Sequence, residues 1–309
     1  MTTLKKISES GAYKDLPMPF YHGDCCDGPS VSSTTLRTVE EHSLRKAWMA
    51  SHLNKDPKKK PSDAFRIGAA LHSLAFEGGL SEKWFAVSPH DKFLTGEAKA
   101  WRDRQINAGK TILKKEELPP LKEMMEALVE DPDVRVLFDE RGELETSVFH
   151  RDEETGLWLK VRPDVVPVNT ILTDLKSTAD VSPHAVTRAV TDYHYHMQLA
   201  LAGEVIEKVI GVAIETYALV LIEKDPPYSV AVAEIDPDAI AWGKVLNRAA
   251  MRRYAECLAK GPEAKNFPRN RTTGIMTIRL PDWKVAQLTR RQEAGDLPSF
   301  YDVGYMAPH

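Results

Sequence analysis

Two short segments combine residues that could do chemistry: Arg162-Pro163-Asp164 and, ten residues after Asp164, Asp174-Leu175-Lys176. In an extended strand, residues two apart point to the same face, so we expect Asp174 and Lys176 to project side by side. Asp164, at the end of the preceding strand, can meet Asp174 across the short connection. Two neighbouring carboxylates repel each other unless a cation lies between them, and they offer the hard oxygen ligands that Mg²⁺ or Mn²⁺ prefers.

Hydrolysis of a phosphodiester is the chemistry that these residues suit. A bound divalent ion would polarise the scissile phosphate and lower the pKa of a water molecule, while Lys176 would orient that water or stabilise the charge developing on phosphorus. Considered alone, an Asp-x-Lys triplet is more often a solvated strand end, and Asp164 is equally well explained as a turn residue after Pro163. The surrounding sequence therefore has to decide between the two interpretations.

The expected secondary structure places these residues on a sheet between helices. Apolar and polar alternation predicts strands at 146–151, 157–162, 171–176, 217–222 and 230–235. Helical spacing predicts helices over 34–46 and 62–78, two more within 97–140 around a Pro-Pro break, an interrupted stretch over 182–208, and a long helix over 237–259. This order of elements predicts an α/β (α+β) fold built around one mixed sheet.

One of the predicted helices carries a histidine on a face of small residues. Gly68 and Ala69 lie about one turn before His72, and Ala75 lies nearly one turn after it, which would let the strand that bears Asp174 approach closely. A histidine on an apolar helix face is more often a satisfied core residue than a metal ligand. His72 is therefore a candidate ligand that depends on its surroundings.

Six fragments and two closing segments follow one another along the chain: Phe65–His72, Glu145–Phe149, Thr155–Leu157, Arg162–Asp164, Asp174–Thr178, Tyr195–Gln198, Glu223–Tyr228 and Leu280–Trp283. Their order and spacing resemble the exonuclease domain of the RecE family (exodeoxyribonuclease VIII). This family is a branch of the PDDEXK nuclease superfamily that also contains lambda exonuclease and RecB-type nuclease domains. The resemblance covers about residues 30–285 and implies a restriction-endonuclease-like core, a central mixed sheet flanked by helices.

The resemblance also implies roles for individual residues. Asp164 and Asp174 match the metal-binding acids of the family, and Lys176 matches its catalytic lysine. His72 matches the histidine that completes the metal shell in RecB-like members. The residue between the second acid and the lysine, Leu175, would lend its backbone carbonyl to the metal.

Two further assignments from the resemblance concern Glu145 and Gln198. Glu145 matches a strand acid that in relatives helps a second metal ion or its water, although it could equally be an exposed strand residue. Gln198 matches the glutamine of a Q-x-x-x-Y motif that contacts the region of the lysine or the DNA end; otherwise it is an ordinary helix amide. Ala202 stands four residues after Gln198, where the family has tyrosine; this departure bears on the DNA contact of the motif and not on the hydrolytic core.

Composition narrows the class of protein. The chain has 309 residues, 42% of them hydrophobic and 28% charged, which is typical of a globular protein. A total of 41 Lys and Arg against 45 Asp and Glu gives a net charge of -4, which argues against a uniformly basic surface but permits a local basic channel. The sequence shows no secretory or membrane-spanning segment, so we expect a cytoplasmic protein without a membrane partner.

The cysteines exclude several kinds of site. Cys25, Cys26 and Cys257 cannot build a disulfide framework, they are one short of the four thiolates of a usual iron–sulfur cluster, and they contain no Cys-x-x-Cys pair for zinc. Basic runs within 55–60, 99–104, 252–253 and 269–271 could line a path for a DNA backbone. The aromatic candidates for stacking on frayed bases are Trp48, Trp84, Trp101 and Tyr193.

Together, the residues favour a Mg²⁺- or Mn²⁺-dependent nuclease with one or two ions in its active site, and the resemblance implies that it is an exonuclease. The resemblance implies linear double-stranded DNA as substrate, degradation from the 5′ end to leave 3′ single strands for recombination, a single-strand annealing protein as partner, and a ring-shaped homo-oligomer. The predicted domains are an irregular arm over 1–30, the exonuclease domain over 31–285 and a tail over 286–309.

Two alternatives stay open. The first is another nuclease of the same fold, either a restriction-like endonuclease or a CRISPR-adaptation nuclease, and the missing cysteine quartet argues against the latter. The second is a DNA-binding or assembly module without catalysis. The presence of Asp164, Asp174 and Lys176 argues against this second alternative.

Overall fold

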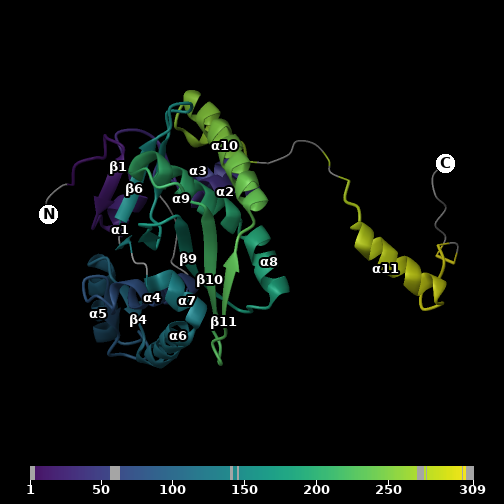
Figure 1. Cartoon of the computed structure of the whole chain (residues 1–309), viewed down its shortest axis with the longest axis horizontal. Helices are drawn as coiled ribbons and strands as arrows, with labels where there is room; N and C mark the ends of the chain where they lie inside the picture. The colour runs from purple at the N-terminus through teal and green to yellow at the C-terminus, as the bar shows by residue number, and fades with distance from the viewer. Residues whose placement is uncertain are drawn as a thin grey trace. The chain divides into compact units, whose positions relative to one another are not determined.

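A computed structural model describes residues 4–55, 63–139, 142–144, 146–269, 275, 277–300 and 302–303. The chain consists of two compact units, residues 1–271 and residues 272–309. The first unit is a mixed α/β structure in which helices surround β-strands (Figure 1). The predicted fold class, a mixed sheet flanked by helices, is confirmed.

The described strands form two main ladders, both of mixed direction. The first has the order β1 (Gly11–Lys14), β6 (Thr146–Arg151), β7 (Trp158–Val161), β2 (Ser30–Val31). The second has the order β11 (Val230–Glu234), β10 (Thr216–Glu223), β9 (Ile171–Thr178). Two short ladders pair β3 (Phe85–Val87) with β4 (Thr111–Leu113) and β5 (Glu143–Leu144) with β8 (Val165–Val166). The single sheet expected from the sequence is thus divided, and the free edge of β9 lies at the division.

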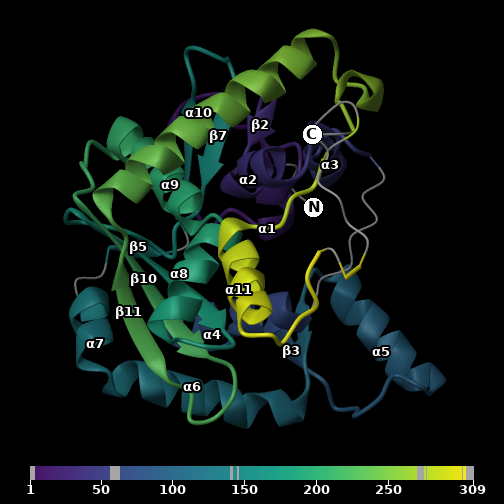
Figure 2. The same cartoon turned by 90° about the vertical axis from the view of Figure 1, so that its right-hand side faces the viewer.

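Helices cover both faces of the β9–β10 ladder (Figures 1 and 2). The helices on one face include α2 (Ser33–Glu41), α9 (Tyr195–Ile210) and α10 (Pro237–Ala259); those on the other include α4 (Asp63–Glu77) and α6 (Leu118–Glu130). Alternate residues of β10 point to opposite faces, so Leu219 and Leu221 join the core with α9 and α10. Val220 and Ile222 join the core with α4 and α6. Residues on β9 are therefore held between two helical layers.

The first unit contains further described helices. They are α1 (Met18–His22), α3 (Leu44–Ala50), α5 (Gly96–Asn107), α7 (Pro132–Asp139), α8 (Pro183–Asp192) and the 3₁₀ turns at Lys115–Glu117 and Ala264–Asn266. None of the helices in the described part of the chain is both long enough and apolar enough to span a membrane.

Several predicted elements have the observed bounds, including β6 and α10, and the predicted interruption near residue 192 separates α8 from α9. The prediction of a single helix over 34–46 is wrong, because Ser43 accepts a hydrogen bond from the backbone N–H of Lys46 and caps a new helix, α3. Pro119 and Pro120 lie in the first turn of α6, where a missing N–H costs nothing. These prolines therefore begin a helix.

The N-terminal thirty residues, expected to be irregular, contain β1 and α1. Strand β1 pairs with β6, with Gly11 opposite Phe149 and Lys14 opposite Thr146. Tyr21, in α1, is buried and packs with Phe149 and Trp158 in a small core cluster. The segment therefore extends a ladder of the first unit.

The second unit contains one helix, α11 (Asp282–Glu293), among its described residues. No described side chain of α11 is buried. The predicted domain boundary at residue 285 falls inside this helix.

Candidate active site

Strand β9 carries three of the predicted site residues. It runs parallel to β10, with Asp174 opposite Leu219 and Lys176 opposite Leu221. Asp174 and Lys176 point to the same face, and the Leu175 side chain between them is fully buried in the core on the other face. Leu175 therefore fixes the strand while its two neighbours face the site.

Asp164 lies at the free edge of β9. Its Oδ2 accepts a hydrogen bond of 2.8 Å from the backbone N–H of Leu175. Because β10 pairs with β9 along the other edge, the carboxylate of Asp164 takes the position that a neighbouring strand would occupy. This bond holds the segment after β7 beside β9 and brings the two acidic residues together.

The segment that leads to Asp164 is also anchored by Arg162. Its Nε donates to Oγ of Ser147 on β6 at 2.7 Å, and its Nη2 donates to the carbonyl oxygen of Leu16 at 2.6 Å. The guanidinium of Arg162 thus ties β6 and the N-terminal segment to the strand end that precedes Asp164. Arg162 therefore helps to position Asp164.

Helix α4 brings His72 to the same place. Nδ1 of His72 lies 2.8 Å from Oδ1 of Asp164, and Nε2 is the ring atom that could still bind a metal. Gly68 itself is not a point of close approach, because a Cβ atom there would have no described neighbour within 4 Å. Helix α4 and β9 share one core cluster, to which Leu71 of the helix and Leu175 of the strand belong.

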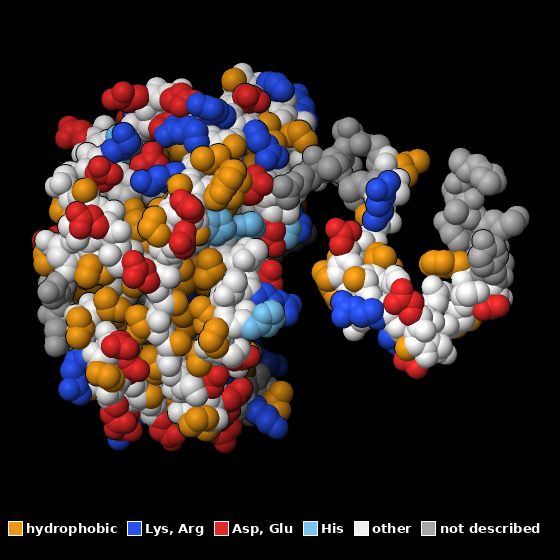
Figure 3. All heavy atoms as spheres, turned by 45° about the vertical axis from the view of Figure 1, so that its right-hand side comes forward, with side chains coloured by type: hydrophobic (Ala, Val, Ile, Leu, Met, Phe, Trp, Pro, Cys, Tyr) orange, Lys and Arg blue, Asp and Glu red, His pale blue; other side chains and the backbone are white. Residues whose placement is uncertain are grey.

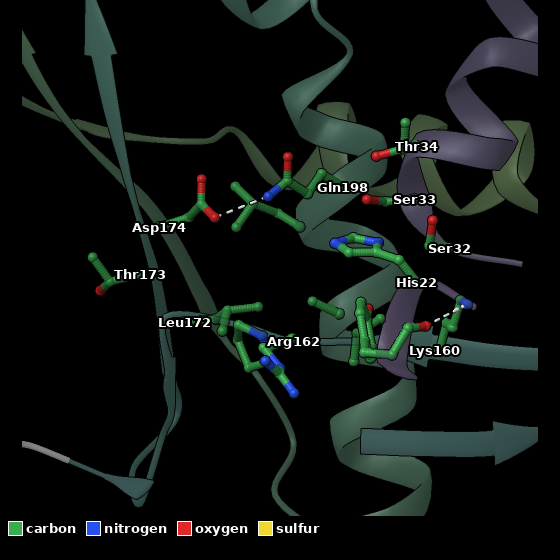
Figure 4. A pocket seen from close by; sticks show the side chains of 15 residues that line it. His22, Ser32, Ser33, Thr34, Lys160, Arg162, Leu172, Thr173, Asp174 and Gln198 are labelled. Atoms are coloured by element: carbon green, nitrogen blue, oxygen red, sulfur yellow. Dashed lines mark hydrogen bonds between the residues drawn. The ribbon is translucent and has the colours of Figure 1, made fainter. Parts of the chain in front are cut away.

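Asp174 has a partner on each side. Its Oδ2 forms an ion pair with Nζ of Lys176, and its Oδ1 accepts a hydrogen bond of 2.9 Å from Nε2 of Gln198 (Figure 4). Gln198 belongs to the first turns of α9, whose buried face packs Met197 and Leu201 into the core. The packing of α9 therefore aims the amide of Gln198 at Asp174.

The four ionisable groups shift one another's pKa values. Burial acts to raise the pKa of Asp164, but the charges of His72 and Lys176 outweigh it and hold that pKa below its ordinary value. Burial raises the pKa of Asp174, and Asp164 adds to the rise. The pKa of Lys176 and that of His72 are raised despite burial, because the carboxylates stabilise their charged forms.

A small cavity of about 100 Å³ opens beside Asp174 and Gln198 (Figure 4). Across from these two residues, the labelled side chains of its wall come from the N-terminal part of the chain and the start of α2: His22, Ser32, Ser33 and Thr34. Lys160 also borders the cavity, but its Nζ is buried and donates to the carbonyl oxygen of Tyr21 at 2.7 Å. The wall opposite Asp174 and Gln198 therefore includes three hydroxyl groups, those of Ser32, Ser33 and Thr34.

Two residues near the carboxylates were given no role in the sequence analysis. Arg37 of α2 is close enough for the charge of Asp174 to act on its pKa, although burial is the stronger effect and lowers that pKa. The ring centroid of Tyr195 lies 5.6 Å from Nζ of Lys176. No local pattern marked Arg37, whereas Tyr195 stood inside a fragment of the resemblance without an assigned role.

Two further positions from the sequence analysis, 145 and 202, differ in where they lie. Glu145 lies outside the described residues. Ala202, four residues after Gln198, is buried in the core, so this position of α9 faces the protein interior. Within the described parts of the chain, no three His, Cys, Asp or Glu side chains are arranged as a ready metal-binding group.

Comparisons with known proteins agree with this fold. The model of a family described as "PDDEXK-like domain of unknown function (DUF3799)" matches residues 32–266. A crystal structure of a "Putative exonuclease" from Eubacterium rectale is similar, with a TM-score of 0.59 at 11% identity, over 88% of this chain and 98% of that chain. No curated protein matches the sequence significantly.

Proposed function

This chain belongs to the DUF3799 family of PDDEXK-like domains, within the PDDEXK nuclease superfamily, and we propose that it is a metal-dependent nuclease that degrades linear double-stranded DNA from its ends. The observation that carries the proposal is the convergence of Asp164, Asp174, Lys176 and His72 at one edge of β9. Burying two carboxylates beside a lysine lowers the stability of the fold, so such a group is expected where it serves a function. Phosphodiester hydrolysis is the function that fits these residues best.

The donor atoms suit a divalent cation. Carboxylate oxygens have two lone pairs each, so Asp164 and Asp174 can keep their hydrogen bonds and still bind a metal. Mg²⁺ or Mn²⁺ would be held by these two carboxylates, the carbonyl of Leu175 and Nε2 of His72, with Glu145 as a further acid for one or two ions. When bound, such an ion would polarise the phosphate and lower the pKa of a water molecule.

The chain's own side chains would then orient and stabilise the reacting groups. The raised pKa keeps Lys176 protonated at neutral pH, so it acts as a cation near the phosphate and not as a general base. Gln198 holds Oδ1 of Asp174 in place. The Leu175 N–H and His72 fix both oxygens of Asp164, so the carboxylates are oriented before substrate binds.

Several finer features belong to the same proposal. Action on DNA ends is supported by the resemblance to the RecE family and by the word exonuclease in the description of the E. rectale protein. Degradation from the 5′ end, release of 3′ single strands to an annealing protein, and a ring-shaped homo-oligomer are supported by the resemblance alone. Light scattering of the purified chain, with and without DNA, tests the oligomer.

The direct test uses linear duplex DNA labelled at the 5′ or the 3′ end, with covalently closed circular DNA as a matched substrate that has no ends. We expect hydrolysis of the linear DNA with Mg²⁺ or Mn²⁺, none with EDTA, and early release of the 5′ label. The Asp174→Asn substitution should abolish hydrolysis of the linear DNA. Equal degradation by wild type and Asp174→Asn would refute the catalytic assignment, and cleavage of the circle would indicate an endonuclease.

A further inference from the structure

Two tyrosine rings lie beside the candidate active site, at the junction of α8 and α9. The ring centroids of Tyr193 and Tyr195 are 5.6 Å apart, with 36° between the ring planes. Tyr193 is 60% exposed. Tyr195 is only partly exposed, and its ring lies next to Nζ of Lys176. The pair therefore extends from the catalytic lysine out to solvent.

The backbone of this junction is held in place. The N–H of Tyr193 donates to the carbonyl of Ala189 at 3.0 Å and ends α8, and the carbonyl of His194 accepts from Met197 at 3.1 Å and begins α9. His194 adopts a left-handed conformation with φ of 51°, which turns the chain sharply between the two helices. The exposed ring of Tyr193 therefore extends from a turn whose backbone is already ordered. The protein loses less conformational entropy when a ligand stacks on such a ring.

Arg37 links this turn to the site. Its Nη1 donates to the carbonyl oxygen of Tyr193 at 2.7 Å, and its Nε is buried and has no hydrogen-bond partner among the described residues. The guanidinium therefore holds the tyrosine turn in place, and it lies close enough to Asp174 and Tyr195 for their charges to act on its pKa, which burial lowers. A cation at this position favours a ligand whose aromatic part is joined to an anionic phosphate.

We propose that Tyr193, supported by Tyr195, is a stacking site for an unpaired nucleobase of the strand whose phosphate lies at Asp174 and Lys176; the proposal rests on the nuclease function above. Two successive separations of 5.6 Å lead from Nζ of Lys176 through the Tyr195 ring to the Tyr193 ring, a span that one or two nucleotides cover. Bases inside a duplex are stacked on both sides, and those of a terminal pair are free on the outer side alone, so a frayed or single-stranded base is the one that can leave the duplex and lie on the Tyr193 ring.

A stacking site at Tyr193 would restrict the kind of DNA that the chain binds. Stacking on an aromatic ring accepts every base, because each has a π-face, so we expect little sequence preference. We expect instead a preference for strands whose terminal bases are unpaired. The chain would then capture DNA at a frayed end, and the stacked base would hold that end open while the neighbouring phosphate lies at the carboxylates.

The test measures binding by the full chain in EDTA, so that hydrolysis cannot interfere. Two fluorescent single-stranded oligonucleotides serve as probes, identical except that one has abasic residues in place of its terminal bases. Tyr193→Ala removes the ring, and Tyr193→Phe keeps it. Trp242→Ala is the matched control, because Trp242 is 65% exposed on α10. Circular dichroism confirms that each variant is folded.

We expect Tyr193→Ala to bind the base-bearing probe about five- to a hundredfold more weakly than wild type and the abasic probe equally well. Tyr193→Phe and Trp242→Ala should bind both probes like wild type. An equal effect of Tyr193→Ala on both probes, no effect on either, or no binding of either probe by wild type would overturn the stacking site. A separate assay of DNA hydrolysis in Mg²⁺ tests the nuclease function. If wild type hydrolyses DNA but Tyr193→Ala binds both probes like wild type, only the stacking site is refuted. If binding depends on the terminal bases but no hydrolysis occurs, only the catalytic function is refuted.

Discussion

The backbone N–H of Leu175 donates to Oδ2 of Asp164, so one candidate metal ligand is hydrogen-bonded to the strand that carries the other. An edge strand leaves a row of backbone groups without partners, and here a side chain satisfies one of them. The same bond brings the two carboxylates together at the edge where the described ladder ends. This hydrogen bond is thus one of the contacts that join the site to the fold.

This relationship predicts different effects for two substitutions of Asp164. Asp164→Asn keeps an oxygen that can accept the Leu175 N–H, whereas Asp164→Ala leaves that buried donor without a partner. We expect both variants to lose hydrolysis, and Asp164→Ala to be less stable than Asp164→Asn by about 1–3 kcal/mol in free energy of unfolding. Urea unfolding measures the difference. Equal stability would mean that the bond does not hold the strand edge.

Lys176 offers a test of its role as a cation. Lys176→Met removes the ammonium while keeping a side chain of similar length, so we expect the rate of hydrolysis to fall about 10²- to 10³-fold, in single-turnover assays at saturating DNA. Lys244, which is exposed on α10, supplies the control, and Lys244→Met should retain the wild-type rate. A Lys176→Met enzyme as fast as this control would remove Lys176 from the mechanism.

Local sequence patterns predicted the elements whose bounds depend on local interactions. Helix α10 begins where Asp236 caps the backbone N–H of Asp238 and Pro237 occupies the first turn, and all three residues are adjacent in the sequence. The break between α2 and α3 depends on the conformation of Ser43, which apolar spacing does not reveal. At the edge of β9, Asp164 meets Leu175, and this is a tertiary contact that alternation along each strand cannot indicate.

In the candidate site, too, local patterns predicted neighbours along one strand but not contacts between distant segments. Asp174 and Lys176 could be placed on one face because a strand has a period of two. The contact of His72 with Asp164 joins residues 92 apart, and only the resemblance to a family suggested it. Arg37 and Tyr195 meet the site only once α2 and α9 pack together, so nothing in their immediate sequence distinguished them from ordinary helix residues.

Gln198 should control the protonation of Asp174. Gln198→Leu removes the hydrogen bond to Oδ1, and we expect hydrolysis about 10- to 100-fold slower. Gln198→Glu places a like charge there, which raises the already elevated pKa of Asp174, so more of that carboxyl is protonated at a given pH. The acidic limb of the pH–rate profile should therefore move to higher pH. An unchanged profile for Gln198→Glu would contradict this role.

A pH-dependent contribution to stability is expected at the turn between β6 and β7. Asp152 is only 4% exposed. Its Oδ1 accepts from Nη1 of Arg248 at 2.8 Å, and its Oδ2 accepts from the N–H and hydroxyl of Thr155 at 2.9 Å and 2.6 Å. Burial acts to raise the pKa of Asp152, but these partners hold it below its ordinary value.

A carboxyl whose folded pKa is lowered stabilises the fold above its unfolded pKa, about 3.9, and loses that contribution as the pH falls through the folded value. We therefore expect Asp152→Asn to lower the free energy of unfolding by about 1–3 kcal/mol at neutral pH and by less in acid. Asp103→Asn, in an exposed pair with Arg102, should change stability little at any pH. Urea unfolding across this range measures both, and a pH-independent Asp152→Asn effect would contradict the account.

Metal binding itself can be measured without any reaction. An ion that binds the folded chain and not the unfolded chain raises the melting temperature with concentration, contributing about 2.7 kcal/mol when the ion is at a hundred times its Kd. We expect Mn²⁺ to raise the melting temperature of wild type and not that of Asp164→Asn or Asp174→Asn. Asp103→Asn is the matched control for the loss of one carboxylate and should respond like wild type. If Mn²⁺ stabilises the two active-site variants as much as wild type, the ion binds elsewhere, and these two carboxylates do not hold it.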